Sequence, residues 1–471
     1  MKDASARSWA ANRWHLSRRA ALSLLLVFAA GFVPASVAPA GGSAVPARTQ
    51  AQRAEVVRDL LDERTAAVAS HDAARWTATV NPVDPDFTAR QDALFATLVG
   101  LPLAALTYSY AGVGPALDSV RARELGPGAF TAKVRLRYRL AEADHRDVQR
   151  DHQLTITRFD GRWLVADDVH PGGVGRTQLD PWDLGSVDVA RGRFSIVLSR
   201  PGAAGLSDPD RAGRAGRAGL AGLADRAVEQ VQELWRGPWP GRVVVIMPVD
   251  VGEMAQLIGE HGPGGVAGLA QMAAVTTGQP AGEPGGVTTG NRIVVNPDVF
   301  AALTETGRRV VLAHEATHVA TRTLGGAPVQ SWLAEGFADY VAYRGAGTGV
   351  EKIAGDLLAQ VRAGIAPVQL PAEVDFHVNR GPVSASYSLA WLAVRHIAQT
   401  HGEARLVELY LTAAAGPTTG AGTPQDPAAA TDAALGEVLG VSMEEFREAW
   451  GDAVVDAAGP AVPGSGTEQA R

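Results

Sequence analysis

The spacing of apolar positions predicts that the chain begins with a block of helices followed by strands. Apolar residues recur at helical spacing over 56–68, and a second helical pattern covers 87–99. Residues 133–140 instead alternate strictly between apolar and polar side chains. This alternation predicts a strand with one buried face and one face lined by arginines.

A hairpin is predicted to close this first block. The strands expected over 154–159 and 163–166 flank Asp160 and Gly161, a pair typical of a tight turn. Helices followed by a curved antiparallel meander resemble the nuclear transport factor 2-like (SnoaL-like) cone, and the ending "RFDGRWLVADD" is similar to that family's last hairpin. The resemblance implies a cone-like α+β domain over residues 51–170.

The second block, residues 191–456, combines buried strands with a helical second half. Short apolar runs predict strands over 194–198, 243–247 and 292–295. The Arg-Ala-Gly repeat of 211–219 is predicted to be a loop that grades into a helix over 225–234, and helices dominate after residue 304. The whole chain is therefore expected to be α+β, with a mixed sheet in this block.

The ends and the boundaries of the two blocks have compositions of their own. Arginines precede an apolar run of 14 residues over 20–33, and the small residues 38–40 offer a cleavage site. This order predicts that residues 1–40 are a secretory signal peptide, with an uncleaved membrane anchor over 20–38 as the alternative. Export to the outside or to the cell envelope is therefore expected. The remaining boundary segments are predicted to be linkers over 41–50 and 171–190 and a disordered tail over 457–471.

Composition narrows the chemistry. The net charge is −7, from 43 basic and 50 acidic residues, so no general positive field attracts nucleic acid, and we expect no nucleic-acid partner. The chain has no cysteine, which excludes disulfides, thiol catalysis and cysteine-bound zinc. Any metal must therefore be held by His, Asp or Glu.

The most informative segment is an HExxH motif inside the helix predicted over 304–324. His314 and His318 are four residues apart, which places both imidazoles on one face of a helix, one turn apart. Zinc favours such ligands. Glu315 lies one position round the helix, where its carboxylate can accept a proton from an attacking water.

A second carboxylate motif follows within a few turns. Glu335 lies 17 residues after His318, at the start of another predicted helix, and can supply the third protein ligand that a catalytic zinc site requires. Asp339 lies four residues further, on the same face. A metal-bound histidine normally donates its other ring N–H to a carboxylate or carbonyl, and Asp339 can accept from His314.

The two motifs together resemble a known family. "HEATH" followed by "WLAEGFADY" is similar to the gluzincin metallopeptidases, most of all to the bacterial peptidase MA-like family, over about residues 190–455. The resemblance implies a zincin-like domain and one set of roles: zinc ligands His314, His318 and Glu335, general base Glu315, and a supporting role for Asp339.

Two further expectations concern the substrate. In members of this family, a Tyr or His from a later helix stabilises the oxyanion of the tetrahedral intermediate. The resemblance therefore implies Tyr387 in this role, with His377 as the alternative. Aminopeptidase N-like members carry a strand whose Glu holds the substrate's amino group, but the comparable residues here, 268–275, contain no carboxylate. This departure argues against aminopeptidase specificity, whereas the segment stays a candidate sheet edge for a peptide strand.

The sequence therefore predicts an exported zinc metallopeptidase that acts on a peptide or protein. The rival hypothesis is a non-catalytic binding or scaffold protein of the cell envelope built on a zincin frame, because a fold does not fix a function. Glu315 discriminates between them, since a structural zinc site needs no base beside an open position.

Overall fold

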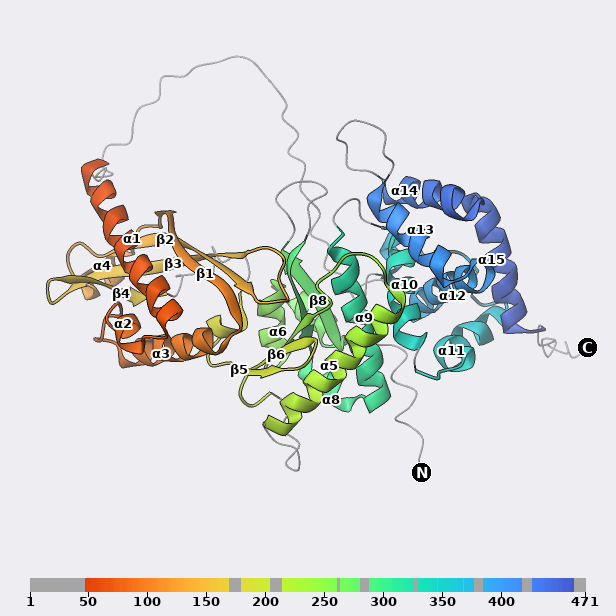
Figure 1. Ribbon diagram of the computed structural model, residues 1–471, viewed down its shortest axis with the longest axis horizontal. Helices are drawn as coiled ribbons and strands as arrows, with labels where there is room; N and C mark the ends of the chain where they lie inside the picture. The colour runs from red at the N-terminus through yellow and green to blue at the C-terminus, as the bar shows by residue number, and fades with distance from the viewer. Residues whose placement is uncertain are drawn as a thin grey trace, which may run out of the picture.

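The computed structural model shows an α+β protein with two separate sheets, drawn in Figure 1. The residues that it describes are 47–168, 179–203, 214–260, 263–279, 288–324, 329–344, 346–366, 368–376, 384–416 and 426–460. The predicted signal segment and His377 lie outside these residues. In the part of the chain that is described, no helix is both long and apolar enough to cross a membrane.

The N-terminal part is a four-stranded antiparallel sheet in the order β1-β2-β3-β4, packed against helices that precede it. Its elements are α1 (Ala47–Ser70), α2 (Ala73–Thr77), α3 (Pro85–Gly100), β1 (Leu103–Val113), α4 (Ser119–Glu124), β2 (Phe130–Leu140), β3 (Val148–Phe159) and β4 (Arg162–Asp167). The predicted hairpin is confirmed, because Phe159 pairs with Arg162 across Asp160 and Gly161, whose φ angles are 47° and 77°. Such left-handed angles at both turn residues are typical of a two-residue hairpin loop.

The second part contains a five-stranded mixed sheet in the order β5-β6-β7-β9-β8. Its strands are β5 (Asp188–Arg191), β6 (Ser195–Ser199), β7 (Val243–Met247), β8 (Ala274–Gln279) and β9 (Thr289–Val295). The three central strands are parallel, whereas the two edge strands β5 and β8 run antiparallel to their neighbours. The mixed sheet predicted for this block is confirmed.

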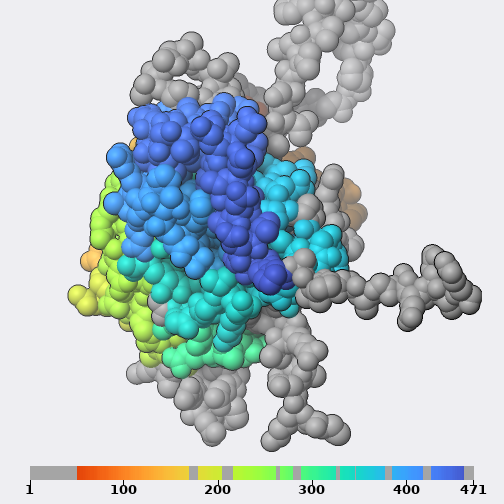
Figure 2. Space-filling model, turned by 90° about the vertical axis from the view of Figure 1, so that its right-hand side faces the viewer, coloured from red at the N-terminus to blue at the C-terminus, as the bar shows by residue number. Residues whose placement is uncertain are grey.

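Helices make up the rest of the second part, and those after β9 form the end of the molecule seen in Figure 2. The longer ones are α5 (Arg214–Leu234), α6 (Val251–Ile258), α7 (Pro263–Leu269), α8 (Pro297–Ala302), α9 (Glu305–Arg322), α10 (Ser331–Arg344), α11 (Val350–Arg362), α12 (Ser384–His401), α13 (Glu403–Ala415), α14 (Pro427–Ala434) and α15 (Met443–Ala458). Short turns are η2 (Pro181–Asp183), η3 (Glu373–Phe376) and the π-helical η5 (Leu435–Leu439).

The five-stranded sheet is buried on both faces. Val245 and Ile293 belong to a core shared with the helices of the second part, α9 and α10 among them. Their neighbours Ile246 and Val294 belong to a different core, which is continuous with that of the N-terminal part. Successive residues of a strand point to opposite faces, so one sheet separates the two cores.

The boundaries differ from the sequence prediction in several places. Helix α1 begins at Ala47, within the linker predicted over 41–50, and β5 lies partly within the linker predicted over 171–190. The repeat predicted as a loop is helical from Arg214 onward. Arginine and alanine make up two thirds of that repeat and are strong helix formers, which outweighs its glycines.

Candidate metal centre

The first two predicted ligands lie on α9. The helix begins after Thr304, whose hydroxyl accepts a hydrogen bond from the backbone N–H of Gly307, and it continues to Arg322. His314 and His318 therefore lie one turn apart, and their Nε2 atoms are 3.0 Å from each other. Both side chains are buried, with exposed fractions of 0% and 5%.

The third predicted ligand comes from α10. Oε2 of Glu335 lies 3.4 Å from Nε2 of His314 and 3.4 Å from Nε2 of His318. The possible ligand atoms of the three residues all lie within 4.8 Å of one another. The structure thus brings together two histidines and a carboxylate that are well separated in the sequence.

This group fits a cation. Both carboxylate oxygens of Glu335 are buried and have no hydrogen-bond partner among the described residues. A buried carboxylate without complete hydrogen bonds is costly, because it has lost its hydration. Two imidazole nitrogens and one carboxylate form the donor set of a catalytic zinc site with one open position.

The pKa values of the group reflect its buried charges. Burial alone would lower the pKa of His314, but the nearby carboxylates of Asp339 and Glu335 outweigh it and raise the pKa to about 10. Burial alone would raise the pKa of Glu335, but the two histidines hold it well below its ordinary value. The opposite charges of His314 and Glu335 therefore stabilise each other inside the protein.

The structure places Asp339 where it can orient a ligand. Its Oδ1 lies 3.0 Å from Nδ1 of His314, so the other ring nitrogen of that histidine faces Glu335. Gly336 lets α10 approach α12 closely, because a Cβ at that position would lie 2.3 Å from the carbonyl oxygen of Ala390. The glycine therefore fixes the depth at which Glu335 enters the site.

Glu315 is held by a residue that the sequence analysis missed. The hydroxyl of Thr276, on edge strand β8, lies 2.5 Å from Oε2 of Glu315 and 3.1 Å from its backbone oxygen. Arg322 donates to the carbonyl oxygen of Thr276 at 2.6 Å. Three hydrogen bonds thus join the helix that carries the histidines to the edge of the sheet.

Tyr387 lies beside His314, on the first turn of α12. Its ring centroid is 6.5 Å from that of His314 and 5.2 Å from that of Phe376. The tyrosine is 1% exposed. Of the two oxyanion donors expected from the sequence, the structure therefore places Tyr387 next to the site, whereas His377 lies outside the described residues.

The start of α10 is supported by a second residue that no local pattern indicates. Glu373, in η3, accepts hydrogen bonds from the backbone N–H of Ser331 at 2.9 Å and from its hydroxyl at 2.6 Å. The first backbone N–H groups of a helix have no partner within the helix, so this carboxylate acts as a cap. It fixes the turn from which Glu335 projects.

Comparisons of the chain with protein-family models, with curated proteins and with solved structures each found no match.

Proposed function

We propose that the protein is a zinc-dependent metallopeptidase that hydrolyses peptide bonds. His314, His318 and Glu335 would hold the zinc ion. The observation that carries this proposal is the buried carboxylate of Glu335, which faces two imidazoles and has no other partner among the described residues. A bound zinc ion polarises the scissile carbonyl and activates water.

Glu315 supplies the proton transfers. It directly follows His314 on α9, and Thr276 of β8 holds one of its carboxylate oxygens. The other oxygen accepts the proton of the attacking water and later passes it to the leaving amine. Tyr387 donates a hydrogen bond to the oxygen that becomes negative in the transition state.

The substrate lies along β8. This strand is the outermost of its sheet, and no strand covers its free edge in the part of the chain that the structure describes. An extended peptide can add to such an edge through backbone hydrogen bonds. The candidate edge in the sequence was residues 268–275. Only the last two of these residues belong to β8, and the first two are the end of α7.

The N-terminal pattern supports export of this enzyme. A peptidase released or anchored outside the membrane meets proteins of the cell envelope, so peptide or protein substrates are expected there. Mass spectrometry of the native protein should find an N-terminus near residue 41, and an intact Met1 in a soluble cytoplasmic fraction would contradict export.

Replacement of Glu315 by Gln tests the proposal. The amide is almost the same size and is not a ligand, so zinc content should be unchanged, whereas cleavage of a peptide library should fall by about 10²–10⁴-fold. An equal rate in the parent and the variant would contradict the proposal. If both proteins bind zinc and neither cleaves peptides, the non-catalytic binding hypothesis replaces it.

A further inference from the structure

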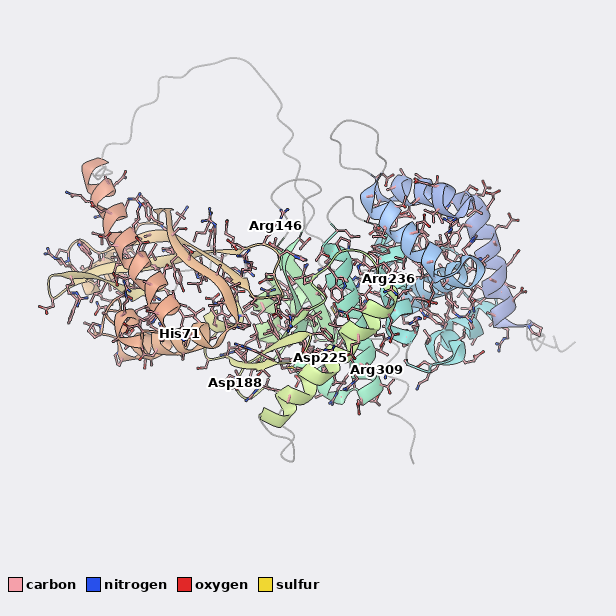
Figure 3. The ribbon with its side chains drawn as sticks, viewed as in Figure 1. His71, Arg146, Asp188, Asp225, Arg236 and Arg309 are labelled. Atoms are coloured by element: carbon pink, nitrogen blue, oxygen red, sulfur yellow. The ribbon has the colours of Figure 1, made fainter. Side chains whose placement is uncertain are left out.

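Arg322, the last residue of α9, lies on the side of the helix that carries the proposed metal ligands. It follows His318 by four residues and His314 by eight, so the three side chains share one face at intervals of about one turn. Glu315 precedes it by seven residues, which is two turns. Figure 3 shows the side chains of this helix, with Arg309 labelled nearer its start. Arg322 therefore continues the row of side chains that forms the proposed site.

The guanidinium group of Arg322 is bonded to the free edge of β8. Its Nη1 donates to the backbone oxygen of Thr276 at 2.6 Å. Thr276 lies opposite Ile293 of β9, and in the same register the N–H of Asn296 donates to the oxygen of Ala273. Successive residues of an antiparallel strand turn their backbone groups toward and away from the partner strand, so Ala273 faces β9 and Thr276, three residues later, faces away. Arg322 therefore lies at the edge to which a peptide strand can add.

The same threonine connects Arg322 with the proposed base. The hydroxyl of Thr276 lies 2.5 Å from Oε2 of Glu315. Because one residue makes both contacts, Nη1 of Arg322 is at most about 9 Å from that carboxylate oxygen. An extended peptide advances by roughly 3.3 Å per residue. If the cleaved bond lies at Glu315, the substrate residues up to about three positions away are within reach of Arg322.

One side of this guanidinium group is left for a ligand. Arg322 is half-buried, and among the described residues its contact with Thr276 is its only hydrogen bond and no carboxylate lies within ion-pair distance. Burial lowers its pKa from the ordinary value, and the carboxylates of Glu315 and Glu335 offset this only in part. Nε and Nη2 form a two-pronged donor that matches the two oxygens of a carboxylate.

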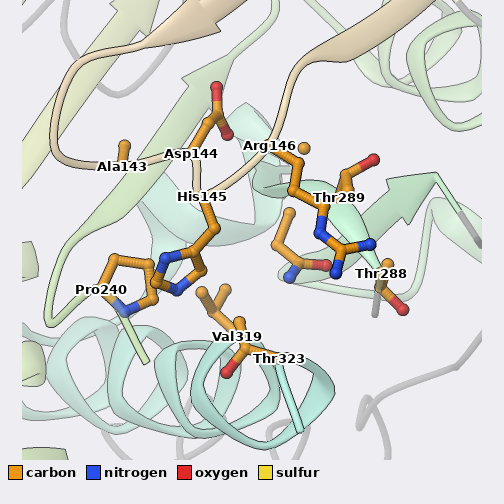
Figure 4. Close-up of a pocket in the computed structure, with 11 residues that line it drawn as sticks. Ala143, Asp144, His145, Arg146, Pro240, Thr288, Thr289, Val319 and Thr323 are labelled. Atoms are coloured by element: carbon orange, nitrogen blue, oxygen red, sulfur yellow. The ribbon is translucent and has the colours of Figure 1, made fainter. Parts of the chain in front are cut away.

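A second arginine beside α9 shows the contrast. Arg292 of β9 donates to both carboxylate oxygens of Asp144, which belongs to the loop between β2 and β3. That loop covers a small pocket above Val319 and Thr323 of α9, drawn in Figure 4. Arg322 does not line this pocket and has no such carboxylate in the part of the chain that is described. Its counter-charge can therefore come from a bound molecule.

We infer that Arg322 is a specificity-determining residue that binds a carboxylate of the peptide substrate, within about three residues of the cleaved bond. The inference rests on the proposed function and names its substrate class. Nε and Nη2 donate to the two carboxylate oxygens, while Nη1 stays bonded to Thr276. The carboxylate belongs either to an Asp or Glu side chain or to the C-terminus of the peptide.

The test measures cleavage by the full-length zinc-loaded protein of two sets of peptides. One set carries Glu or Gln at each position near the cleaved bond, and the other has a free or an amidated C-terminus, which separates the two sources. One carboxylate should be favoured by about fivefold, mainly through KM, because a partly exposed ion pair contributes about 1 kcal/mol.

Two variants show whether Arg322 causes this preference. Arg322→Gln should remove it. Arg308→Gln is the matched control and should keep it, because Arg308 lies on the same helix and also donates to backbone oxygens, those of Phe300 and Ala301. The preference is a ratio of two peptides measured on one protein, so it does not depend on how much of a variant is folded.

Binding of the same peptides to Glu315→Gln, followed by fluorescence anisotropy, separates this inference from the proposed function. A carboxylate preference that disappears when Arg322→Gln is added supports the inference even if the parent cleaves nothing. Absence of any carboxylate preference, or a preference that Arg322→Gln retains, overturns the inference. If peptides are still cleaved in that case, the peptidase proposal stands without it.

Discussion

The two faces of the five-stranded sheet each bury charge, but they do so differently. On the face toward the N-terminal part, Arg292 of β9 meets Asp144, and both ends of the guanidinium group are bonded to the carboxylate. On the face toward the C-terminal helices, Glu335 meets two histidines, and its oxygens have no hydrogen-bond partner among the described residues.

This difference separates a complete structural pair from the group that we propose as a metal site. A buried ion pair whose hydrogen bonds are complete has no need of a ligand and serves to join two parts of the fold. A buried carboxylate that lacks partners, beside two imidazoles, is satisfied by a cation. Whether the hydrogen bonds of a buried charged group are complete, more than its burial or its charge, indicates which cluster we expect to bind a ligand.

The largest effect on stability is expected from the complete pair. Asp144→Ala should lower the free energy of unfolding by about 3–5 kcal/mol, because Arg292 then stays buried without a counter-charge. Asp151→Ala is the matched control, since its pair with Arg135 is about one third exposed on each side and should be worth no more than about 1 kcal/mol. Urea unfolding measures both values.

The comparison fails if the two variants lose the same stability. The double replacement Asp144→Leu with Arg292→Met sharpens it, because an apolar pair of similar size should recover most of the loss. Should the double variant remain as unstable as Asp144→Ala, the loss would come from the shape of the loop and not from the unpaired charge.

A smaller effect, on activity, is expected where Thr276 of the sheet edge holds Glu315. Thr276→Val keeps the shape of the side chain but removes the hydroxyl that holds Glu315, so kcat should fall by about tenfold, the equivalent of one hydrogen bond to a charged group. Thr276→Ser keeps the hydroxyl and should retain most of the activity. Zinc content serves as the control and should be the same in all three proteins.

The sequence predicts the parts of this site that depend on local spacing. Helical periodicity is sufficient to place His314 and His318 together, and the alternation of residues 133–140 predicts β2 and its buried face, which the structure confirms. Short apolar runs also predict the three central strands of the second sheet as strands, although not their parallel direction. These features depend on residues that are close together in the sequence, so a single sequence is sufficient to predict them.

Contacts between distant segments could not be predicted in this way. Thr276 precedes Glu315 by 39 residues, and Glu373 follows Ser331 by 42, so no periodicity connects either pair. The continuity of the N-terminal core with one face of the second sheet was missed for the same reason, because apolar runs predict burial without naming the partner.

Calorimetric titration of the metal-free chain with zinc tests the central claim most directly. At a pH between 6.5 and 10, His314 holds a proton in the metal-free protein, since its pKa is raised to about 10, and a ligand must be deprotonated. The account predicts about one zinc per chain, release of a proton on binding that vanishes above that pKa, and loss of most binding in His318→Ala. Absence of zinc binding by the parent, or equal binding by His318→Ala, would contradict it.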